Sequence, residues 1–236
     1  FVSKATGVPL ARAASRIMMG ESIASLTEQG LLPEHLDGGS LPVDSPVSVK
    51  AAVLPFKRFR TREGQVVDSL LGPEMRSTGE AMGVDTSFGA AFAKAEMGKT
   101  TPLPTSGTVF VSVANRDKRG MIFPVKRLAD LGFTLVGTSG TVEVLRRNGV
   151  EAQVVRKRSE GRGPDGEPTV VDQITSGEVA MVVNTPSGRD ARADGYEIRA
   201  ATASAGVPII TTVQQLGAAV QAIESLQTAD FGVKPL

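Results

Sequence analysis

The chain has 236 residues, of which 41% are hydrophobic and 22% are charged, a composition typical of one large or two smaller folded domains. Its 26 Lys and Arg nearly balance its 25 Asp and Glu, so no strong positive field draws it to nucleic acid or to an anionic membrane. The absence of cysteine excludes disulfides, iron–sulfur clusters, thiolate zinc sites and cysteine nucleophiles, which fits a protein of the reducing cytoplasm.

The first predicted element is a short amphipathic helix over residues 8–19. Its apolar residues recur at helical spacing, and Pro9 suits the first helical position. A Gly- and Pro-rich stretch over 29–46 predicts a loop, and it contains His35, the only histidine. We interpret His35 as a solvated loop residue, so histidine-based metal or acid–base chemistry has one poor candidate. No apolar run approaches the roughly 20 residues that span a bilayer.

A strand and a second helix follow before the pattern changes. Residues 47–54 have the apolar pattern of a strand, and 87–97 place apolar residues on one helical face. The segment 98–107 is rich in turn formers and poor in core residues. We therefore predict a domain boundary there, which divides the chain into residues 1–103 and 104–236.

Beyond this boundary, strand and helix patterns alternate strictly. The predicted strands are 108–113, 134–136, 152–155, 179–183 and 208–210, and the predicted helices are 119–131, 141–148, 170–176, 192–205 and 213–226. Five such units predict an α/β fold with a doubly wound, mostly parallel five-stranded sheet. Ligands of these sheets bind outside the carboxyl ends of the strands, so the residues there are the candidates for function.

Hydroxyls, glycines and cations follow the predicted strands. Hydroxyl groups, helix N-termini and nearby Lys or Arg are what a phosphate monoester requires, and glycine lets the backbone approach its oxygens. A single motif of this kind, such as the Thr-Ser-Gly-Thr turn, is more often an ordinary helix cap than a phosphate site. Together they predict a phosphate site formed by Ser112, Lys118, Thr138, Thr141, Lys157, Asn184, Ser187, Gly188 and Arg189.

A basic stretch over residues 146–162 and a loop over 160–168 adjoin these strand ends. Most of the basic side chains fit a solvated face, and only Lys157, directly after its strand, is placed to reach the ligand end of the sheet. The Gly- and Pro-rich loop is expected to move until a ligand binds.

Three segments carry a family resemblance. Residues 1–11 (FVSKATGVPLA), 70–83 (LLGPEMRSTGEAMG) and 184–189 (NTPSGR) resemble the closing part of the large chains of carbamoyl phosphate synthetases. The resemblance covers nearly the whole chain. It implies that residues 1–103 are the tail of the second ATP-grasp unit, and that 104–236 are an allosteric domain with the methylglyoxal-synthase-like fold.

The resemblance also implies a division of roles. In this family the full-length ligase uses ATP with Mg or Mn and works with a glutaminase small chain, in pyrimidine and arginine biosynthesis. The metal carboxylates precede Phe1 in the family's order, so this fragment is expected to hold no catalytic residue, cofactor or metal of its own. The allosteric domain binds nucleotide monophosphates, UMP or IMP, and the predicted strand-end residues would line that site.

Departures from the family pattern concern two effectors. Pro186 and Asp190 stand where a threonine and an arginine are usual, which removes a hydroxyl and reverses a charge. The resemblance places the amino-acid activator ornithine between Glu80 and the region of Thr211. Ile209 and Ile210 replace a tyrosine and an aspartate there, which counts against ornithine control.

Two alternatives remain open at this stage. One is an interaction or oligomerisation module whose phosphate site has decayed. Residues 1–103, which by the family resemblance lack their packing partners, are expected to self-associate. The other is a lyase of the methylglyoxal synthase type, which needs a carboxylate base and an assisting histidine. Against it, Asp165 lies in the loop and residues 104–236 contain no histidine.

Overall fold

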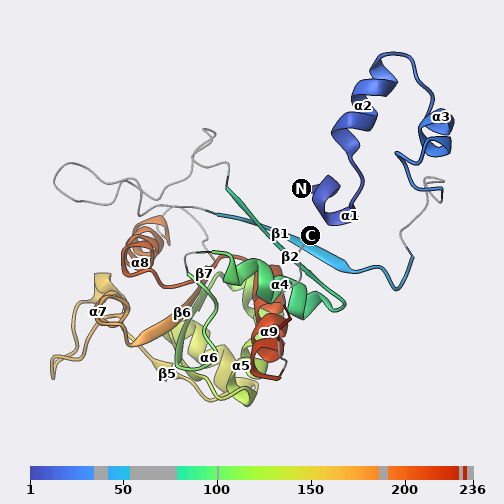
Figure 1. Ribbon diagram of the computed structural model, residues 1–236. Helices are drawn as coiled ribbons and strands as arrows, with labels where there is room; N and C mark the ends of the chain where they lie inside the picture. The colour runs from blue at the N-terminus through green and yellow to red at the C-terminus, as the bar shows by residue number, and fades with distance from the viewer. Residues whose placement is uncertain (35–41, 54–78, 100, 186–190, 229–230, 233–236) are drawn as a thin grey trace, which may run out of the picture.

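The computed structural model describes residues 1–34, 42–53, 79–99, 101–185, 191–228 and 231–232, with only the backbone of 191–194 (Figure 1). His35 and the predicted site residues Ser187, Gly188 and Arg189 lie outside the described residues, as do Pro186 and Asp190.

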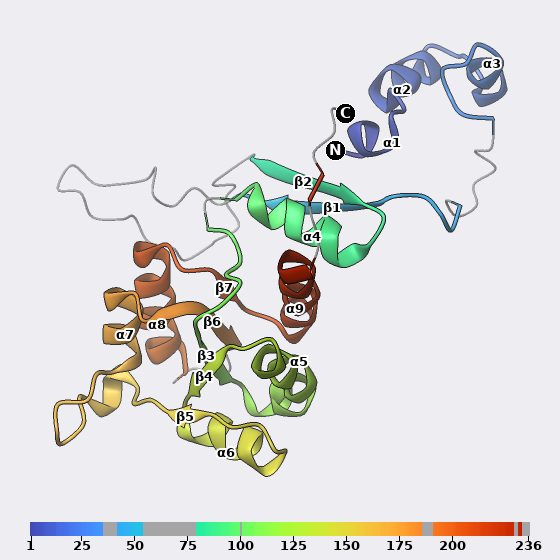
Figure 2. The same ribbon diagram turned by 60° about the horizontal axis from the view of Figure 1, so that its bottom comes forward.

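The chain begins with three short helices, α1 (Val2–Thr6), α2 (Leu10–Met18) and α3 (Ile23–Glu28). Helix α2 confirms the predicted helix, although Pro9 stands at its N-cap, one position before the first helical residue. The sequence did not predict α1 or α3, whose five and six residues are too short for a clear periodicity. Both views place this N-terminal unit away from the large sheet (Figures 1 and 2).

The next unit is a two-stranded antiparallel sheet covered by one helix. Strands β1 (Val47–Ala52) and β2 (Glu80–Asp85) pair with Val49 opposite Gly83, and α4 (Phe88–Met97) packs against both. A side chain at Gly83 would meet the carbonyl oxygen of Ala91 at 1.9 Å, so glycine is needed for this close approach. Strand β2 was not predicted.

The large sheet confirms the predicted doubly wound architecture. Its five strands are all parallel, in the order β5-β4-β3-β6-β7. Their bounds are β3 (Thr108–Val113), β4 (Thr134–Gly137), β5 (Gln153–Val154), β6 (Val179–Thr185) and β7 (Ile209–Ile210). The helices between them are α5 (Lys118–Asp130), α6 (Ser139–Arg147), α7 (Val170–Ser176), α8 (Ala191–Ala205) and α9 (Val213–Thr228), with short 3-10 turns η2 (Asn115–Asp117) and η3 (Arg158–Glu160).

Helices cover both faces of this sheet (Figure 2). Alternate residues of β3 point to opposite faces, so Val109 and Val111 enter one core with α5, α6 and α9, and Phe110 enters the other with α7 and α8. All three of these side chains are fully buried. Burial on both faces explains the nearly continuous apolar sequence of β3.

Helix α9 joins the two-stranded unit to the large sheet. It packs against α4 as well as α5, and an ion pair between Arg127 and Glu224 reinforces its contact with α5. The Gln227 side chain donates to the carbonyl oxygens of Thr105 and Leu131, at 2.8 and 3.1 Å. Packing therefore extends across the predicted boundary near residue 103.

Candidate functional site

The strand order places the topological switch point between β3 and β6. From β3 the chain proceeds to β4 and β5 on one side, and from β6 it proceeds to β7 on the other. Ser112 and Asn184, near the carboxyl ends of these two strands, are paired in register. Ligands of such sheets bind at this position.

Hydroxyl groups from three elements meet at the end of β3. The Thr138 hydroxyl lies 3.4 Å from the Ser112 hydroxyl and 3.2 Å from that of Thr141. Thr141 is 1% exposed and its oxygen accepts the Val113 N–H at 3.4 Å. The structure thus brings Ser112, Thr138 and Thr141 together, as the sequence predicted they would be on one edge.

Lys118 lies against the N-terminus of α6. Its Nζ is 3.2 Å from the position that a side-chain carbon on Gly140 would occupy, so glycine leaves room for the ammonium group. Among the described residues the side chain of Lys118 makes no ion pair or hydrogen bond, whereas its backbone N–H donates to the carbonyl oxygen of Asn115. The N-cap Thr138 makes no side-chain cap, and its carbonyl oxygen accepts from the Thr141 and Val142 N–H groups, so those of Ser139 and Gly140 point out of the helix without an acceptor in the described part of the chain. An unpaired cation beside unsatisfied N–H groups creates positive potential at this point.

Two further residues of this edge were not predicted. Thr185 is buried, and its hydroxyl accepts the Ala114 N–H at 2.9 Å. Its position next to Asn184 at the end of the strand is a sequence signal that could have identified it as a site residue. Arg199 lies in the middle of α8, and its Nη1 is buried without a hydrogen-bond partner, as is Oδ1 of Asn184. No sequence signal distinguishes Arg199 from other helical arginines.

Lys157 lies beyond the end of β5, at the start of the loop that leads to α7. It is half-buried, and its backbone N–H donates to Glu160 Oε2 at 2.9 Å. Strand β5 pairs with β4, whose end carries Thr138, so Lys157 lies on the same edge of the sheet.

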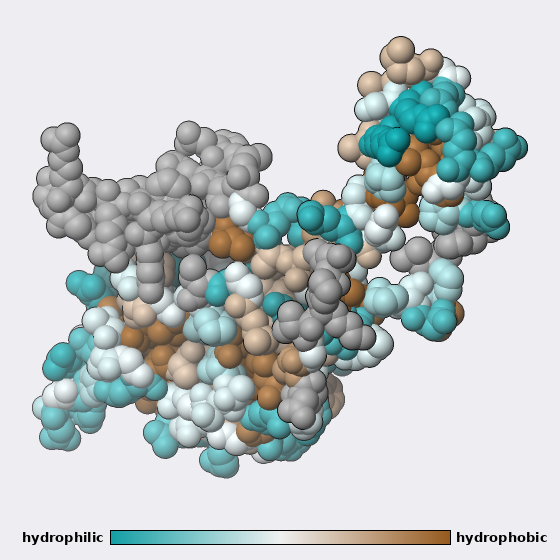
Figure 3. All heavy atoms as spheres, in the orientation of Figure 1, coloured by the Kyte–Doolittle hydropathy of each residue, from teal (hydrophilic) through white to brown (hydrophobic). Residues whose placement is uncertain are grey.

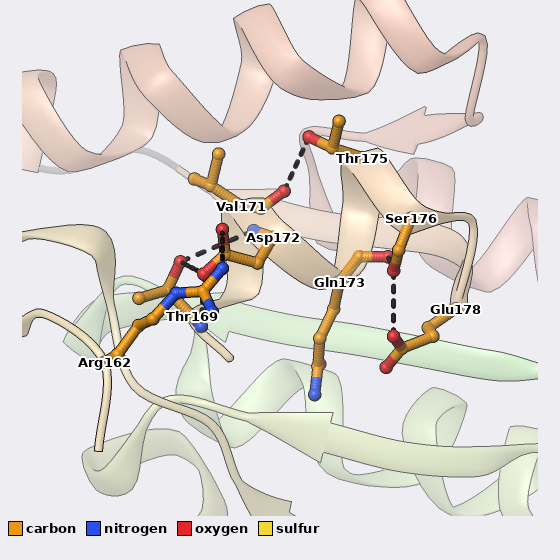
Figure 4. Close-up of polar contacts among 8 residues, drawn as sticks. All are labelled: Arg162, Thr169, Val171, Asp172, Gln173, Thr175, Ser176 and Glu178. Atoms are coloured by element: carbon orange, nitrogen blue, oxygen red, sulfur yellow. Dashed lines mark hydrogen bonds and ion pairs between the residues drawn. The ribbon is translucent and has the colours of Figure 1, made fainter. Parts of the chain in front are cut away.

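Hydrogen bonds hold the end of that loop on α7 (Figure 4). Asp172 accepts from the backbone N–H and the hydroxyl of Thr169, both at 2.9 Å, and pairs with Arg162 at 3.2 Å. The two hydrogen bonds from Thr169, followed by the hydrogen bond and the positive charge of Arg162, lower the pKa of Asp172 below its ordinary value. Asp165 is exposed in this loop.

The two residues predicted to contact ornithine lie in different units. Glu80 begins β2 and forms an ion pair with Lys50 at 2.5 Å, and this hydrogen bond lowers the pKa of Glu80. Thr211 follows β7 and donates its N–H to Gln215 at 3.3 Å. No described contact joins Glu80 to Thr211.

No cluster of three or more His, Cys, Asp or Glu side chains suited to a metal ion occurs in the described part of the chain. Within the same residues, no helix has the length and apolar character needed to cross a membrane.

Comparison with known proteins identifies both the domain and the chain. A family model described as an MGS-like domain matches residues 120–211, from the first turn of α5 to the end of β7. Across the chain, the carbamoyl phosphate synthase large chain of Kineococcus radiotolerans is 68% identical over 225 residues, 95% of this chain and 20% of that protein. The large chains of Micrococcus luteus and Streptomyces griseus are 61% and 58% identical over 236 residues, the whole of this chain and 21% of each.

The chain belongs to the family of carbamoyl phosphate synthase large chains. It spans about a fifth of the length of these curated relatives. The family resemblance seen in the sequence is therefore confirmed, and the parallel sheet is the part that carries the MGS-like domain. The edge of this domain with Lys118 and the hydroxyl cluster is its candidate binding site.

Proposed function

We propose that residues 104–236 form the regulatory domain of a carbamoyl phosphate synthase large chain and bind a nucleotide monophosphate, UMP or IMP. The ligand's phosphate would lie at the N-terminus of α6. The domain would thereby control ATP- and glutamine-dependent synthesis of carbamoyl phosphate for pyrimidine and arginine biosynthesis.

One observation carries this proposal. Lys118 has no ion pair among the described residues and lies beside the uncapped N-terminus of α6, next to the hydroxyls of Thr138 and Thr141. A phosphate dianion would accept from the ammonium, from the hydroxyls and from the helix N–H groups. Residues 104–236 contain no histidine, the group that would assist the chemistry of a lyase of this fold.

The effect on the rest of the large chain would pass through α9. This helix follows Thr211 at the same end of the sheet and packs against α4, which in turn covers β1 and β2. An effector that prefers one arrangement of this packing shifts the equilibrium by no more than that preference, typically about 1–3 kcal/mol.

The remaining parts of the proposal concern the longer protein. Residues 1–103 would be the tail of an ATP-grasp unit, and ATP with Mg or Mn would bind elsewhere in the large chain. The glutaminase small chain and the rest of the large chain would be the protein partners. Exposed apolar side chains on the N-terminal helices, including Met18 at 83% and Met19 at 85% exposure, suit such a contact or self-association (Figure 3).

Titration calorimetry with UMP and with IMP tests the effector site. We expect saturable binding of at least one nucleotide and competition between the two if both bind. Lys118→Met removes the unpaired ammonium and should weaken binding by about 10- to 100-fold, because hydrogen bonds to charged groups are the stronger ones. Lys126→Met, on the exposed side of the same helix, should leave the affinity unchanged.

Two results would contradict the proposal. One is the absence of saturable heat with either nucleotide at millimolar concentration, provided that circular dichroism shows a folded chain. The other is a Lys118→Met variant that binds UMP and IMP as tightly as the parent.

A further inference from the structure

An asparagine followed by glycine ends helix α6. Of the three asparagines, Asn115, Asn148 and Asn184, only Asn148 precedes a glycine. Asn148 is exposed and is the C-cap of the helix, and Gly149 follows it with a positive φ of 73°. Helix α6 lies beside β5, the edge strand of the large sheet (Figure 2). Solvent therefore reaches this end of the helix.

An Asn-Gly pair can react within the chain itself. The backbone nitrogen of Gly149 attacks the side-chain carbon Cγ of Asn148, which forms a C–N bond and closes a succinimide ring. The proton of the attacking N–H passes through water to the side-chain nitrogen, which leaves as ammonia. One water then hydrolyses either C–N bond of the ring and leaves aspartate or isoaspartate. Glycine favours the attack, because it has no side chain to block the approach of its nitrogen.

The folded chain holds the two reacting atoms of this pair apart. Ring closure requires the Gly149 nitrogen and Cβ of Asn148 to lie on the same side of the Asn148 Cα–C bond. The ψ of Asn148 is 18°, so the Gly149 nitrogen nearly eclipses the backbone nitrogen of Asn148 and is turned away from Cβ. The side-chain Nδ2 of Asn148 also donates to the carbonyl oxygen of Val144 at 2.8 Å, which fixes the amide on the helix.

Hydrogen bonds of the last turn of α6 maintain this geometry. The Gly149 N–H donates to the carbonyl oxygen of Arg146 at 3.0 Å, and the Val150 N–H donates to that of Leu145 at 3.0 Å. These two bonds form the Schellman motif that commonly ends a helix at a glycine. Val150 and Leu145 are 2% and 0% exposed and belong to the same buried cluster, so apolar burial also holds this turn together.

We propose that Asn148 is a site of spontaneous deamidation, which the folded end of α6 protects from reaction. The reaction proceeds when the last turn opens far enough to release the Gly149 N–H and to let ψ of Asn148 rotate. Opening of one helix end costs less free energy than unfolding of the whole sheet, so local opening sets the rate. This inference is independent of nucleotide binding.

The product of the reaction prevents the turn from forming again. A carboxylate at position 148 has no N–H to donate to the carbonyl oxygen of Val144, and its negative charge is unfavourable at the C-terminus of a helix. An isoaspartyl link also lengthens the backbone, which displaces Gly149 and Val150 from their acceptors. Deamidation therefore makes a transient opening of the helix end permanent.

The test follows the conversion of Asn148 with time at constant pH and temperature. The parent chain is incubated folded and in guanidinium chloride, and Val150→Ala and Val220→Ala are incubated folded. Brief digestion and tandem mass spectrometry then measure the fraction of each asparagine that has been converted. Val220 is a matched control, because its substitution removes the same methyl groups from the same buried cluster but in α9. Circular dichroism and denaturant unfolding are recorded for every sample.

We expect Asn148 of the folded parent to react at least about tenfold more slowly than in guanidinium chloride. Val150→Ala should accelerate the reaction of the folded chain about tenfold, because it removes apolar burial that holds the last turn. Val220→Ala should react at the rate of the parent, although it lowers the free energy of unfolding. Asn115 and Asn184 should remain unconverted in the folded samples.

Several results would overturn the inference. If Asn148 does not react in guanidinium chloride, it is not a deamidation site, and equal rates in the folded and unfolded parent would mean that α6 does not protect it. Equal rates for Val150→Ala and Val220→Ala would mean that opening of the α6 end does not control the reaction. The milder variant Val150→Thr replaces Val150→Ala in this comparison if the latter does not fold.

Discussion

The N-terminal helices and the parallel sheet use the same kinds of residue and bury them to very different extents. Around α2 and α3 the fully or nearly buried apolar side chains are Ala13, Leu26 and Leu32. The sheet instead buries two large clusters, one on each face. Met18 and Met19, at the end of α2, remain exposed, whereas Met121 of α5 and Met181 of β6 are fully buried.

This difference shows what local sequence does and does not provide. Amphipathic spacing makes α2 helical, but its apolar face needs a partner from elsewhere to be buried. The sheet supplies such partners for α5 to α9. The two regions should therefore unfold as separate cooperative units, with most of the stability in the sheet.

The largest expected effect comes from one substitution made in both regions. Leu145 in α6 and Leu26 in α3 are both fully buried, yet Leu145 belongs to the large cluster. Leu145→Ala should lower the free energy of unfolding of the sheet by about 3–5 kcal/mol, and Leu26→Ala should leave it unchanged. Denaturant unfolding followed by tyrosine fluorescence measures this directly, because the only tyrosine, Tyr196, lies in α8 and the chain has no Trp.

Circular dichroism supplies the control for this comparison. Leu26→Ala should reduce the helical signal at low denaturant concentration without moving the tyrosine transition. A shift of that transition as large as the one caused by Leu145→Ala would mean that both regions unfold together.

An intermediate effect is expected at the contact between α4 and α9, which joins the two-stranded unit to the large sheet. A side-chain carbon at Gly89 would lie 2.8 Å from the carbonyl oxygen of Gln221 and 2.6 Å from Oγ of Ser225, both in α9. Gly89→Ala should therefore destabilise the tyrosine-monitored unit by about 1–3 kcal/mol. Gly217→Ala, in α9 with open space around it, should stabilise it by about 0.5–1 kcal/mol. If Gly89→Ala matched Gly217→Ala in sign, α4 would not be docked on α9.

The smallest expected effect is a difference in acid sensitivity. Asp172 and Glu21 both have lowered pKa values, Asp172 chiefly through Thr169 and Glu21 chiefly through its hydrogen bond with Arg16. A carboxylate whose folded pKa is lowered contributes stability above its ordinary pKa, and this contribution is lost as the pH falls through the folded value. Asp172→Asn should thus reduce the loss of sheet stability between about pH 7 and about pH 3.

Glu21→Gln is the matched variant in the N-terminal unit. It should leave the pH dependence of the tyrosine transition unchanged, because Arg16 and Glu21 lie outside the sheet's core. If the free energy of unfolding falls equally with decreasing pH in the parent and in Asp172→Asn, the hydrogen bonds of Asp172 do not contribute to the stability of the sheet.

The sequence predicted the elements whose pattern is strong and local. All five strands of the large sheet and the helices between them were placed correctly to within a few residues, and α7 was placed at its observed bounds of Val170 and Ser176. Strand β2 was missed because Gly83 weakens its strand pattern, yet the close approach of Ala91 requires that glycine. The site followed the same rule: Ser112, Thr138 and Thr141 were found because they lie at or just after the carboxyl ends of strands, whereas Arg199 has no comparable position.

The sequence by itself determined the order of strands and helices, the polar edge at their carboxyl ends and the membership of the family. Apolar periodicity and strand-end chemistry are local properties, so they can be read along the chain. Only the tertiary structure decided that α4 packs on α9 and that glycine admits Lys118 to the start of α6. These features depend on distances between residues far apart in the chain, which are set when the helices pack on the sheet.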